Sequence, residues 1–195
     1  MPYDDGDIKI AGEPDRRPVC AEDIGRELEK AQKSGELARA RTLGVVMAQT
    51  FAGLGQAGAA LLPGVCPEVK PDAAPEPEIL REQRILMVFA VAYGFDKFTR
   101  NSLISRTALN VFYDTLKTID SGLYEDLNSS GAFSFYYLAV RRGGDIERAV
   151  GSTFAMLCSR DGDAVLTELG EALFCRFCSV VTEKVELLGL SVIEN

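Results

Sequence analysis

The 195-residue chain contains no histidine. This absence excludes a Ser-His-Asp triad or a Cys-His pair within the chain, a metal site ligated by histidine and a pH switch based on imidazole. An enzyme built from this chain would need carboxylates, lysine, tyrosine, serine or cysteine, or a borrowed cofactor. No paired carboxylates stand out on one apolar face, so we name no catalytic residue, predict no cofactor and favour a protein without enzymatic activity.

Positive charge is also scarce, with 21 lysines and arginines against 29 aspartates and glutamates and a net charge of −8. An acidic surface of this kind repels phosphate backbones. Basic residues cluster only in pairs, such as Arg39 with Arg41 and Arg141 with Arg142, and neither pair forms a stripe. We therefore expect an acidic protein that does not bind nucleic acid.

Cysteine is sparse and odd in number, with five residues in the chain. Such a set does not form the pattern of a disulfide framework. Residues 1–18 contain no basic stretch followed by an apolar run, which is the pattern of a secretory signal peptide. These two observations predict a cytoplasmic protein in a reducing environment.

The longest stretch without charge runs from Thr42 to Pro67. A transmembrane helix needs about 20 apolar residues, so a membrane span is one interpretation of this stretch. Polar side chains at Gln49, Thr50 and Gln56 interrupt it, and its glycines dilute its hydrophobicity. We favour a buried or partner-facing helix and disfavour a membrane span at 43–62.

The same stretch has the spacing of a helix that packs closely against another one. Apolar or small residues recur every three to four positions from Leu37 to Leu61. Each glycine inside a helix costs about 1 kcal/mol against alanine, and close approach of a second helix would offset that cost. The section before residue 63 has too little apolar surface to stand alone, so it docks on the rest of the chain or on a second copy. We predict a self-association interface at Gly44, Met47, Phe51, Leu54 and Gly58.

Helical spacing recurs in one segment after another along the chain, with short turns between the segments and neither sustained strand alternation nor an internal repeat. The sequence predicts an all-α fold, a bundle of about six to seven helices. Five of the eight prolines fall between positions 63 and 77, which indicates a stiff, extended linker. The predicted parts are a flexible or extended arm at 1–18, an N-terminal helical section at 19–62, the proline-rich linker at 63–77 and a C-terminal helical bundle at 78–195. The linker marks either a domain boundary or a long loop within one domain.

The C-terminal bundle is expected to surround one central helix. That helix begins at Pro77 and Glu78, both of which suit a first turn, and continues through an uncharged run from Ile85 to Phe95. A run that is apolar on every side of a helix indicates burial on every side.

Spacing and capping residues predict the other elements of the bundle. Residues 102–119 and 132–140 are predicted helices, the second despite a composition that also suits a strand. Asp145 and Asp163 each stand where an N-cap is expected, so each begins a further helix. The serine- and glycine-rich residues 120–131 are expected to form a turn-rich connection, with one short helical turn as the alternative.

Two cysteines, Cys175 and Cys178, stand three positions apart in the last predicted helix. At about 100° per residue, Cys175 falls in the middle of the polar face of that helix and Cys178 at its margin. A structural zinc site would need two more ligands, and neighbouring carboxylates keep a mid-helix thiol protonated. We favour inert or interface thiols, with a metal or ligand contact at Cys175 and Cys178 as the second interpretation and a redox pair as the third.

Two further segments are candidates for ligand binding. In "RRGGD", residues 141–145, two glycines precede a helix N-terminus, and Arg141 and Arg142 could add charge-assisted bonds to an anion. In "AFSFYYLAV", Tyr136 and Tyr137 could line an apolar pocket and donate to a ligand. Solvated arginines in a loop and aromatic core residues are the favoured interpretations of these two segments.

The sequence thus favours a helical interaction protein that self-associates through the glycine-rich helix 43–62, and therefore a homo-oligomer. The alternative is a small-molecule-binding module, or a histidine-independent enzyme, with a pocket among helices 85–95, 132–140 and 146–158. Neither hypothesis names a specific ligand.

Overall fold

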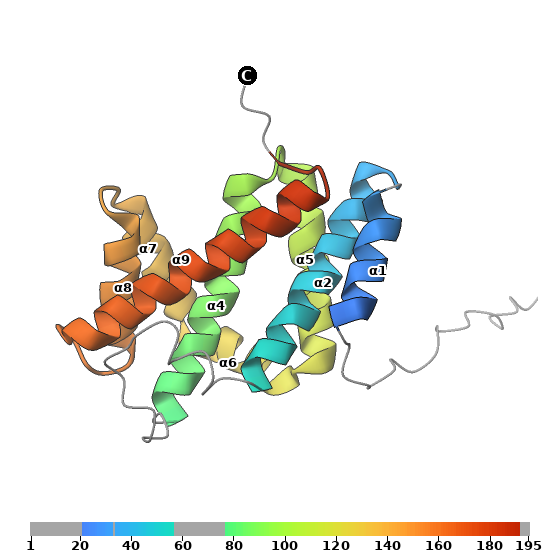
Figure 1. The fold of residues 1–195 in the computed structure, drawn as a ribbon. Coiled ribbons are helices and arrows are strands. Elements are labelled where there is room, and N and C mark those ends of the chain that lie inside the picture. Colours follow the sequence, from blue (N-terminus) through green and yellow to red (C-terminus); the bar gives the residue numbers. More distant parts are fainter. Residues whose placement is uncertain (1–20, 33, 57–76, 192–195) are drawn as a thin grey trace, which may run out of the picture.

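The computed structural model describes residues 21–32, 34–56 and 77–191, and within them it contains eight helices and no strand (Figure 1). The all-α prediction is confirmed. The predicted arm at 1–18 and all but the last residue of the predicted linker lie outside the described residues. The helices are α1 (Ala21–Gln32), α2 (Glu36–Gln56), α4 (Pro77–Phe98), α5 (Ser102–Ile119), α6 (Ser121–Ser130), α7 (Ala132–Arg141), α8 (Ile146–Leu157) and α9 (Ala164–Leu187).

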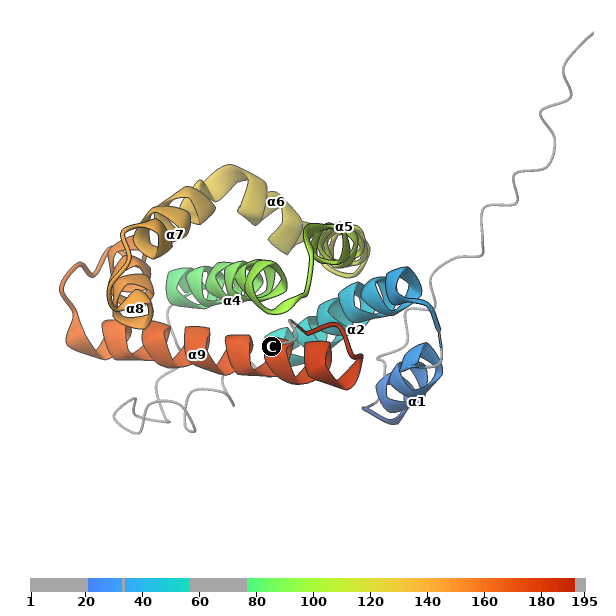
Figure 2. The same ribbon diagram turned by 90° about the horizontal axis from the view of Figure 1, so that it is seen from above.

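Helix α4 is the centre of the bundle, as its uncharged run predicts. Every residue from Ile85 to Phe95 is buried except Tyr93, which is partly exposed. Seen from above (Figure 2), α5, α6, α7, α8 and α9 surround α4. The apolar run therefore meets another helix on every side.

Helix α2 packs along α5 of its own chain, and a glycine permits the approach. A Cβ atom on Gly44 would lie 2.9 Å from the backbone nitrogen of Phe112, and closer still to the carbonyl oxygen of Ala108. The two backbones could not come this close with any larger residue at position 44. The close approach that the sequence predicts is thus made to the chain itself.

Helix α9 is held against α8 by a pair of glycines. Gly151 of α8 lies under the backbone of α9, where an added Cβ would be 3.0 Å from the nitrogen of Glu171. Gly170 of α9 faces Phe154 of α8, whose Cβ would be 2.7 Å from an added Cβ. Each helix therefore has a glycine against the other. Gly151 allows contact with the α9 backbone, and Gly170 makes room for the Phe154 ring.

The predicted N-caps are confirmed. Oδ1 of Asp145 accepts a hydrogen bond from the nitrogen of Arg148 at 3.0 Å, and Oδ1 of Asp163 accepts one from the nitrogen of Leu166 at 3.0 Å. Each carboxylate satisfies a backbone donor that the first turn leaves free. Both helices begin one residue after the predicted cap.

The segment 120–131 was predicted as a turn-rich connection, and this prediction is wrong. The structure has a ten-residue helix there, α6. Its serines, asparagine and glycine give weak helix propensity, and only Leu123 is fully buried. Two caps stabilise this helix despite its composition: Asp120 at the N-terminal end and Gly131, with φ of 65°, at the C-terminal end.

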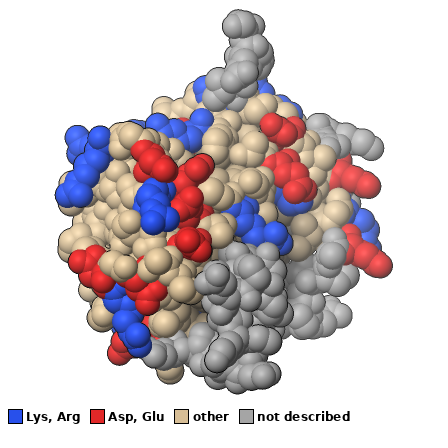
Figure 3. All heavy atoms as spheres, turned by 60° about the vertical axis from the view of Figure 1, so that its left-hand side comes forward, with Lys and Arg blue, Asp and Glu red and all other residues tan. Residues whose placement is uncertain are grey.

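None of the helices in the described residues combines the length and apolarity that a membrane span requires. On the face shown in Figure 3, acidic and basic side chains are interspersed, and the described residues form no basic stripe there. This face does not have the electrostatic footprint of a nucleic-acid-binding surface.

Candidate functional site

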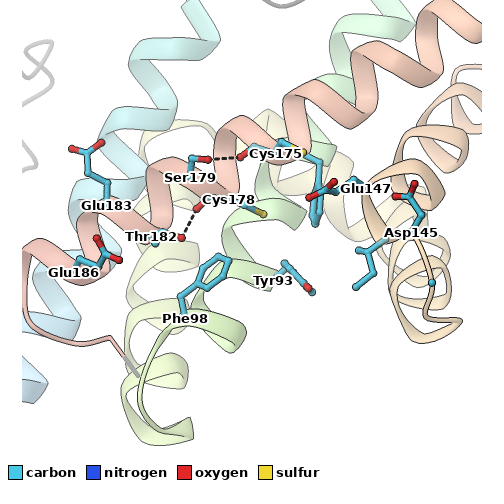
Figure 4. Close-up of a pocket in the computed structure, with 13 residues that line it drawn as sticks. Tyr93, Phe98, Asp145, Glu147, Cys175, Cys178, Ser179, Thr182, Glu183 and Glu186 are labelled. Atoms are coloured by element: carbon cyan, nitrogen blue, oxygen red, sulfur yellow. Dashed lines mark hydrogen bonds between the residues drawn. The ribbon is translucent and has the colours of Figure 1, made fainter. Parts of the chain in front are cut away.

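A pocket of about 720 Å³ opens between the C-terminal half of α4, the start of α8 and the C-terminal half of α9 (Figure 4). We call it the α9 pocket. Its lining includes three aromatic residues, four carboxylates, two cysteines and two hydroxyl residues, namely Tyr93, Phe98, Phe174, Asp145, Glu147, Glu183, Glu186, Cys175, Cys178, Ser179 and Thr182. Both cysteines singled out from the sequence therefore share one cavity.

The polar face of α9 forms one wall of this pocket. The opposite face of the helix is buried against α4, where a Cβ on Gly94 would be 2.8 Å from Cγ1 of Val181. On the pocket side, Ser179 Oγ donates to the carbonyl oxygen of Cys175 at 2.9 Å, and Thr182 Oγ1 donates to that of Cys178 at 2.9 Å (Figure 4). Both hydroxyl protons are thus used within the helix, and the hydroxyl oxygens remain as acceptors.

The start of α8 forms the facing wall. Gly143 and Gly144, with φ of 71° and 80°, turn the chain into α8, and the Asp145 cap fixes the first turn. Glu147 follows in that turn, and its carboxylate lies close beside Cys175 (Figure 4). The cysteine on the polar face of the last helix is therefore faced by a carboxylate from another helix.

The aromatic part of the wall comes from α4 and α9. The rings of Tyr93 and Phe174 have centroids 5.4 Å apart, and both rings also lie against Phe89 in the core. The ammonium nitrogen of Lys97 lies 5.8 Å from the centroid of the Tyr93 ring. This geometry is that of a cation–π contact.

The thiols of the pocket are held in their protonated form. Burial raises the pKa of Cys175, and the negative charge of Glu147 and a hydrogen bond to it raise the pKa further. Burial, followed by the charges of Cys175 and Glu147, raises the pKa of Cys178 to about 12. Since the thiolate is the reactive form of cysteine, neither side chain is activated for nucleophilic or redox chemistry.

The described residues contain no group of three or more cysteine, aspartate or glutamate side chains arranged to hold a metal ion. Cys175 and Cys178 both lie on the pocket wall, each partly buried. With two thiols only, the four-ligand set of a structural zinc site is not assembled in the described part of the chain. The pair therefore lies where a ligand in the pocket would touch it.

The tyrosines proposed as ligand donors lie elsewhere, in the aromatic cluster around Phe89. Tyr136 is fully buried, with its ring centroid 5.0 Å from that of Phe89 and, among the described residues, no hydrogen-bond partner for its hydroxyl. Tyr137 is half exposed and meets the edge of Phe89 at 5.2 Å. Neither residue lines the α9 pocket, and Tyr136 takes the role of a core residue.

The two arginines of the "RRGGD" segment also stay outside the pocket. Arg141 and Arg142 are exposed at the end of α7. Asp145 already accepts from one backbone donor of the α8 N-terminus, the nitrogen of Arg148, and the negative charge of that carboxylate disfavours an anion there. The segment instead supplies Gly144 and Asp145 to the pocket lining.

The residues predicted to form a self-association interface are largely in the core. Gly44, Met47 and Phe51 are buried, and the Phe51 ring lies 6.3 Å from that of Phe112 and 6.1 Å from that of Phe177. Leu54 belongs to α2, and Gly58 lies outside the described residues. Of the predicted interface, Gly44 is therefore covered by α5, and Phe51 by α5 and α9, of the same chain.

The sequence predicts a pocket among helices 85–95, 132–140 and 146–158, and the structure supports two of these three. The α9 pocket uses α4 and the start of α8, but its third wall is α9 rather than α7. The residues missed include Tyr93, Phe98, Glu147 and Phe174. They have no common signal in the sequence: Glu147 stands two residues after a capping aspartate, Phe174 stands next to Cys175, and the rings of Tyr93 and Phe98 come from a helix far away in the chain.

A second, smaller pocket of about 490 Å³ lies between α5, α6 and the start of α7. Its lining is mostly neutral, with Tyr113, Tyr124 and Phe133 as aromatic residues and Asp114 as the charged one. It contains none of the site residues predicted from sequence.

The described residues thus define an all-α protein with an open pocket of mixed aromatic and acidic character. Comparisons with protein-family models, with curated proteins and with solved structures give no match to this chain. Function is therefore argued from the chemistry of the pocket.

Proposed function

We propose that the chain is a small-molecule-binding module and that the α9 pocket is its site. The observation that carries this proposal is the composition of the cavity wall. Small-molecule sites typically combine apolar and aromatic walls with a few convergent polar groups, as the lining of the α9 pocket does. The volume of the cavity, about 720 Å³, also falls within the roughly 300–1,000 Å³ of such sites.

The walls of the pocket are fixed by contacts that do not involve a ligand, which supports the proposal. The Gly151 and Gly170 crossings lock α8 to α9, and Gly94 lets α4 approach α9 closely. A preformed cavity does not have to be ordered by the ligand, so less binding free energy is lost on association.

Binding rather than catalysis is the role that the lining groups support. The two thiols are kept protonated by burial and by Glu147, and one oxygen of Asp145 is engaged as a helix cap. The cytoplasmic location that we propose rests on the sparse, odd set of five cysteines, which does not form the pattern of a disulfide framework.

Self-association remains a prediction of the sequence, and we place it second. Its motivation was uncovered small apolar surface on α2, and Gly44, Met47 and Phe51 are covered within the chain. Light scattering after size exclusion measures the mass of the particle and tests this prediction independently of the pocket.

The binding function is tested with amide NMR of the full chain and three probes that share a phenyl ring and a two-carbon arm: phenethylamine, 2-phenylethanol and 3-phenylpropionate. We expect at least one probe to shift the amide signals of Glu147, Cys175 and Ser179. Ser179→Trp, which fills the pocket, should abolish these shifts.

Ser152→Trp is the matched control. Ser152 is exposed on α8, and its Oγ donates to the carbonyl oxygen of Arg148 at 3.0 Å, as Ser179 Oγ does to Cys175. This variant should retain the shifts. The proposal fails if none of the three probes perturbs the pocket, or if Ser179→Trp binds as the wild type does.

A further inference from the structure

The charge of the α9 pocket is unbalanced. Four carboxylates line it, Asp145, Glu147, Glu183 and Glu186, while no lysine or arginine is among its lining residues. Glu183 is paired with Lys184 on the same helix at 2.8 Å. The three other carboxylates leave a cavity that is negative overall and repels an anion.

Burial and the negative charge of the pocket raise the pKa values of the tyrosine and the two cysteines that line it. Burial raises the pKa of Tyr93, Cys175 and Cys178 above their ordinary values. The negative charge of Glu147 raises the pKa further, as the next cause at Cys175, after Cys175 at Cys178, and after Cys178 and Asp96 at Tyr93. These three side chains stand on two helices, α4 and α9, so the influence of Glu147 extends across the cavity. The negative electrostatic potential of Glu147 therefore extends into the space that a ligand would occupy.

The aromatic wall suits a cation as well. The ring of Tyr93 already has one ammonium group near it, that of Lys97 at 5.8 Å from the ring centroid. Lys97 is exposed, and it does not line the cavity. An aromatic face that attracts the chain's own ammonium group can attract that of a ligand.

The cation that fits is organic rather than a metal ion. The described residues hold no cluster of three metal-ligating side chains, and a cavity of about 720 Å³ is far larger than a single ion. Tyr93 and Phe98, both partly exposed, offer apolar surface that a hydrated metal ion cannot use.

We infer that the α9 pocket selects a small organic cation, an ammonium group carried on an apolar body. The carboxylate of Glu147 and the ring of Tyr93 face the charge, and the partly exposed ring of Phe98 faces the body. Glu186, about three turns along α9 from Cys175, adds to the negative potential of the cavity. This inference rests on the proposed function and adds the class of ligand. A neutral ligand of the same shape binds more weakly, and an anionic one more weakly still.

The three NMR probes separate the charge of the ligand from its shape, because at pH 7 one is a cation, one is neutral and one is an anion. We expect phenethylamine to bind about fivefold more tightly than 2-phenylethanol at low salt, the size expected from screened, exposed ion pairs together with a cation–π contact. We expect 3-phenylpropionate to bind most weakly. Added salt should weaken the binding of the amine and leave that of the alcohol unchanged.

Glu147→Gln should bring the affinity for phenethylamine close to that for 2-phenylethanol, while the affinity for the alcohol stays as it is. Glu168→Gln, which removes an exposed carboxylate of α9 outside the pocket, should change neither. Glu186→Gln serves as the second pocket variant, so that the test survives if Glu147→Gln folds poorly.

The outcomes separate the two proposals. Equal affinities for the amine and the alcohol at the pocket amides would overturn the cation inference and leave the binding function standing. If no probe shifts the pocket amides, both proposals fail together. Tighter binding of the amine that persists in both pocket variants would place the cation site elsewhere and overturn the inference.

Discussion

The carboxylate of Asp120 joins two helices through its two oxygens. Oδ2 pairs with the guanidinium of Arg84 on α4, and Oδ1 accepts a hydrogen bond at 3.0 Å from the nitrogen of Leu123 in the first turn of α6. Helix α6, which composition alone does not predict, is thus both begun and attached to the central helix by one side chain.

Asp120→Ala should therefore destabilise the protein more than the loss of a cap alone. We expect a loss of about 2 kcal/mol, from the cap and from a partly buried ion pair that leaves Arg84 without its partner. Asp163→Ala, which removes a cap that has the same 3.0 Å hydrogen bond, should cost about 1 kcal/mol. Urea unfolding of both variants measures the difference, and equal losses would contradict the dual role of Asp120.

Gly44→Ala tests the crossing of α2 and α5. The obstacle to a methyl group at this position is backbone, the nitrogen of Phe112 and the carbonyl of Ala108, so neither neighbour can rotate away. We expect a loss of about 3 kcal/mol or more of unfolding free energy.

Gly25→Ala is the control for that variant, because nothing lies within 4 Å of an added Cβ on α1. It should stabilise the chain by up to about 1 kcal/mol through helix propensity. A tolerated alanine at position 44 would show that the two helices can separate, and would reopen α2 as a surface for another chain.

The free energy of unfolding depends on pH through the carboxyl group of Glu82. The residue is 3% exposed, and burial raises its pKa above the ordinary 4.5, although a hydrogen bond and the charge of Arg81 lower it. Because the pKa in the folded state exceeds that in the unfolded state, the folded state binds more protons. The contribution of Glu82 to stability is thus present below about pH 4.5 and is lost as the pH rises through the raised pKa.

Glu82→Gln cannot ionise and should melt above the wild type at neutral pH, with the gain in melting temperature shrinking as the pH falls toward 4.5. Glu125→Gln, at an exposed position of α6, should show no such trend. Melting curves recorded across the acidic range check this. A gain that is constant with pH would mean that Glu82 is not the titrating group.

Glu147→Gln should also make the pocket thiols more reactive. Removing the carboxylate removes its charge and its hydrogen bond, both of which raise the pKa of Cys175. The thiolate fraction therefore increases, and alkylation by iodoacetamide at mildly alkaline pH should be severalfold faster at Cys175.

Peptide-resolved mass spectrometry distinguishes Cys175 from the other cysteines in that experiment. Glu168→Gln, which is not among the groups that shift the pKa of Cys175, should leave the rate unchanged. An unchanged rate in Glu147→Gln would show that burial alone keeps the thiol protonated.

Central and capped elements are predictable from the sequence because their signals are local. The uncharged run from Ile85 to Phe95 suits only a helix buried on all sides, and α4 is that helix. Asp145 and Asp163 act within three residues of their own position. Helix α6 was missed because its serines, asparagine and glycine are typical of a turn, and because one of its stabilising contacts, Arg84 with Asp120, links positions far apart in the chain.

The candidate site was predicted only in part for a similar reason. Helical periodicity places Cys175 on the polar face of its helix, and this face does line the pocket. Periodicity says nothing of which helix lies opposite, so Glu147 could not be found. For α2, the spacing of Gly44, Met47 and Phe51 identifies a packing face but not the chain that covers it.

The position of α9 in the chain has a consequence for biosynthesis. The central helix α4 is completed long before α9 leaves the ribosome, and its face around Gly94 is covered only when Val181 arrives. During translation that apolar face is open to solvent and to chaperones. The last of the described helices to be made is therefore the one that both protects the core and creates the pocket, so a nascent chain that stops before α9 has neither.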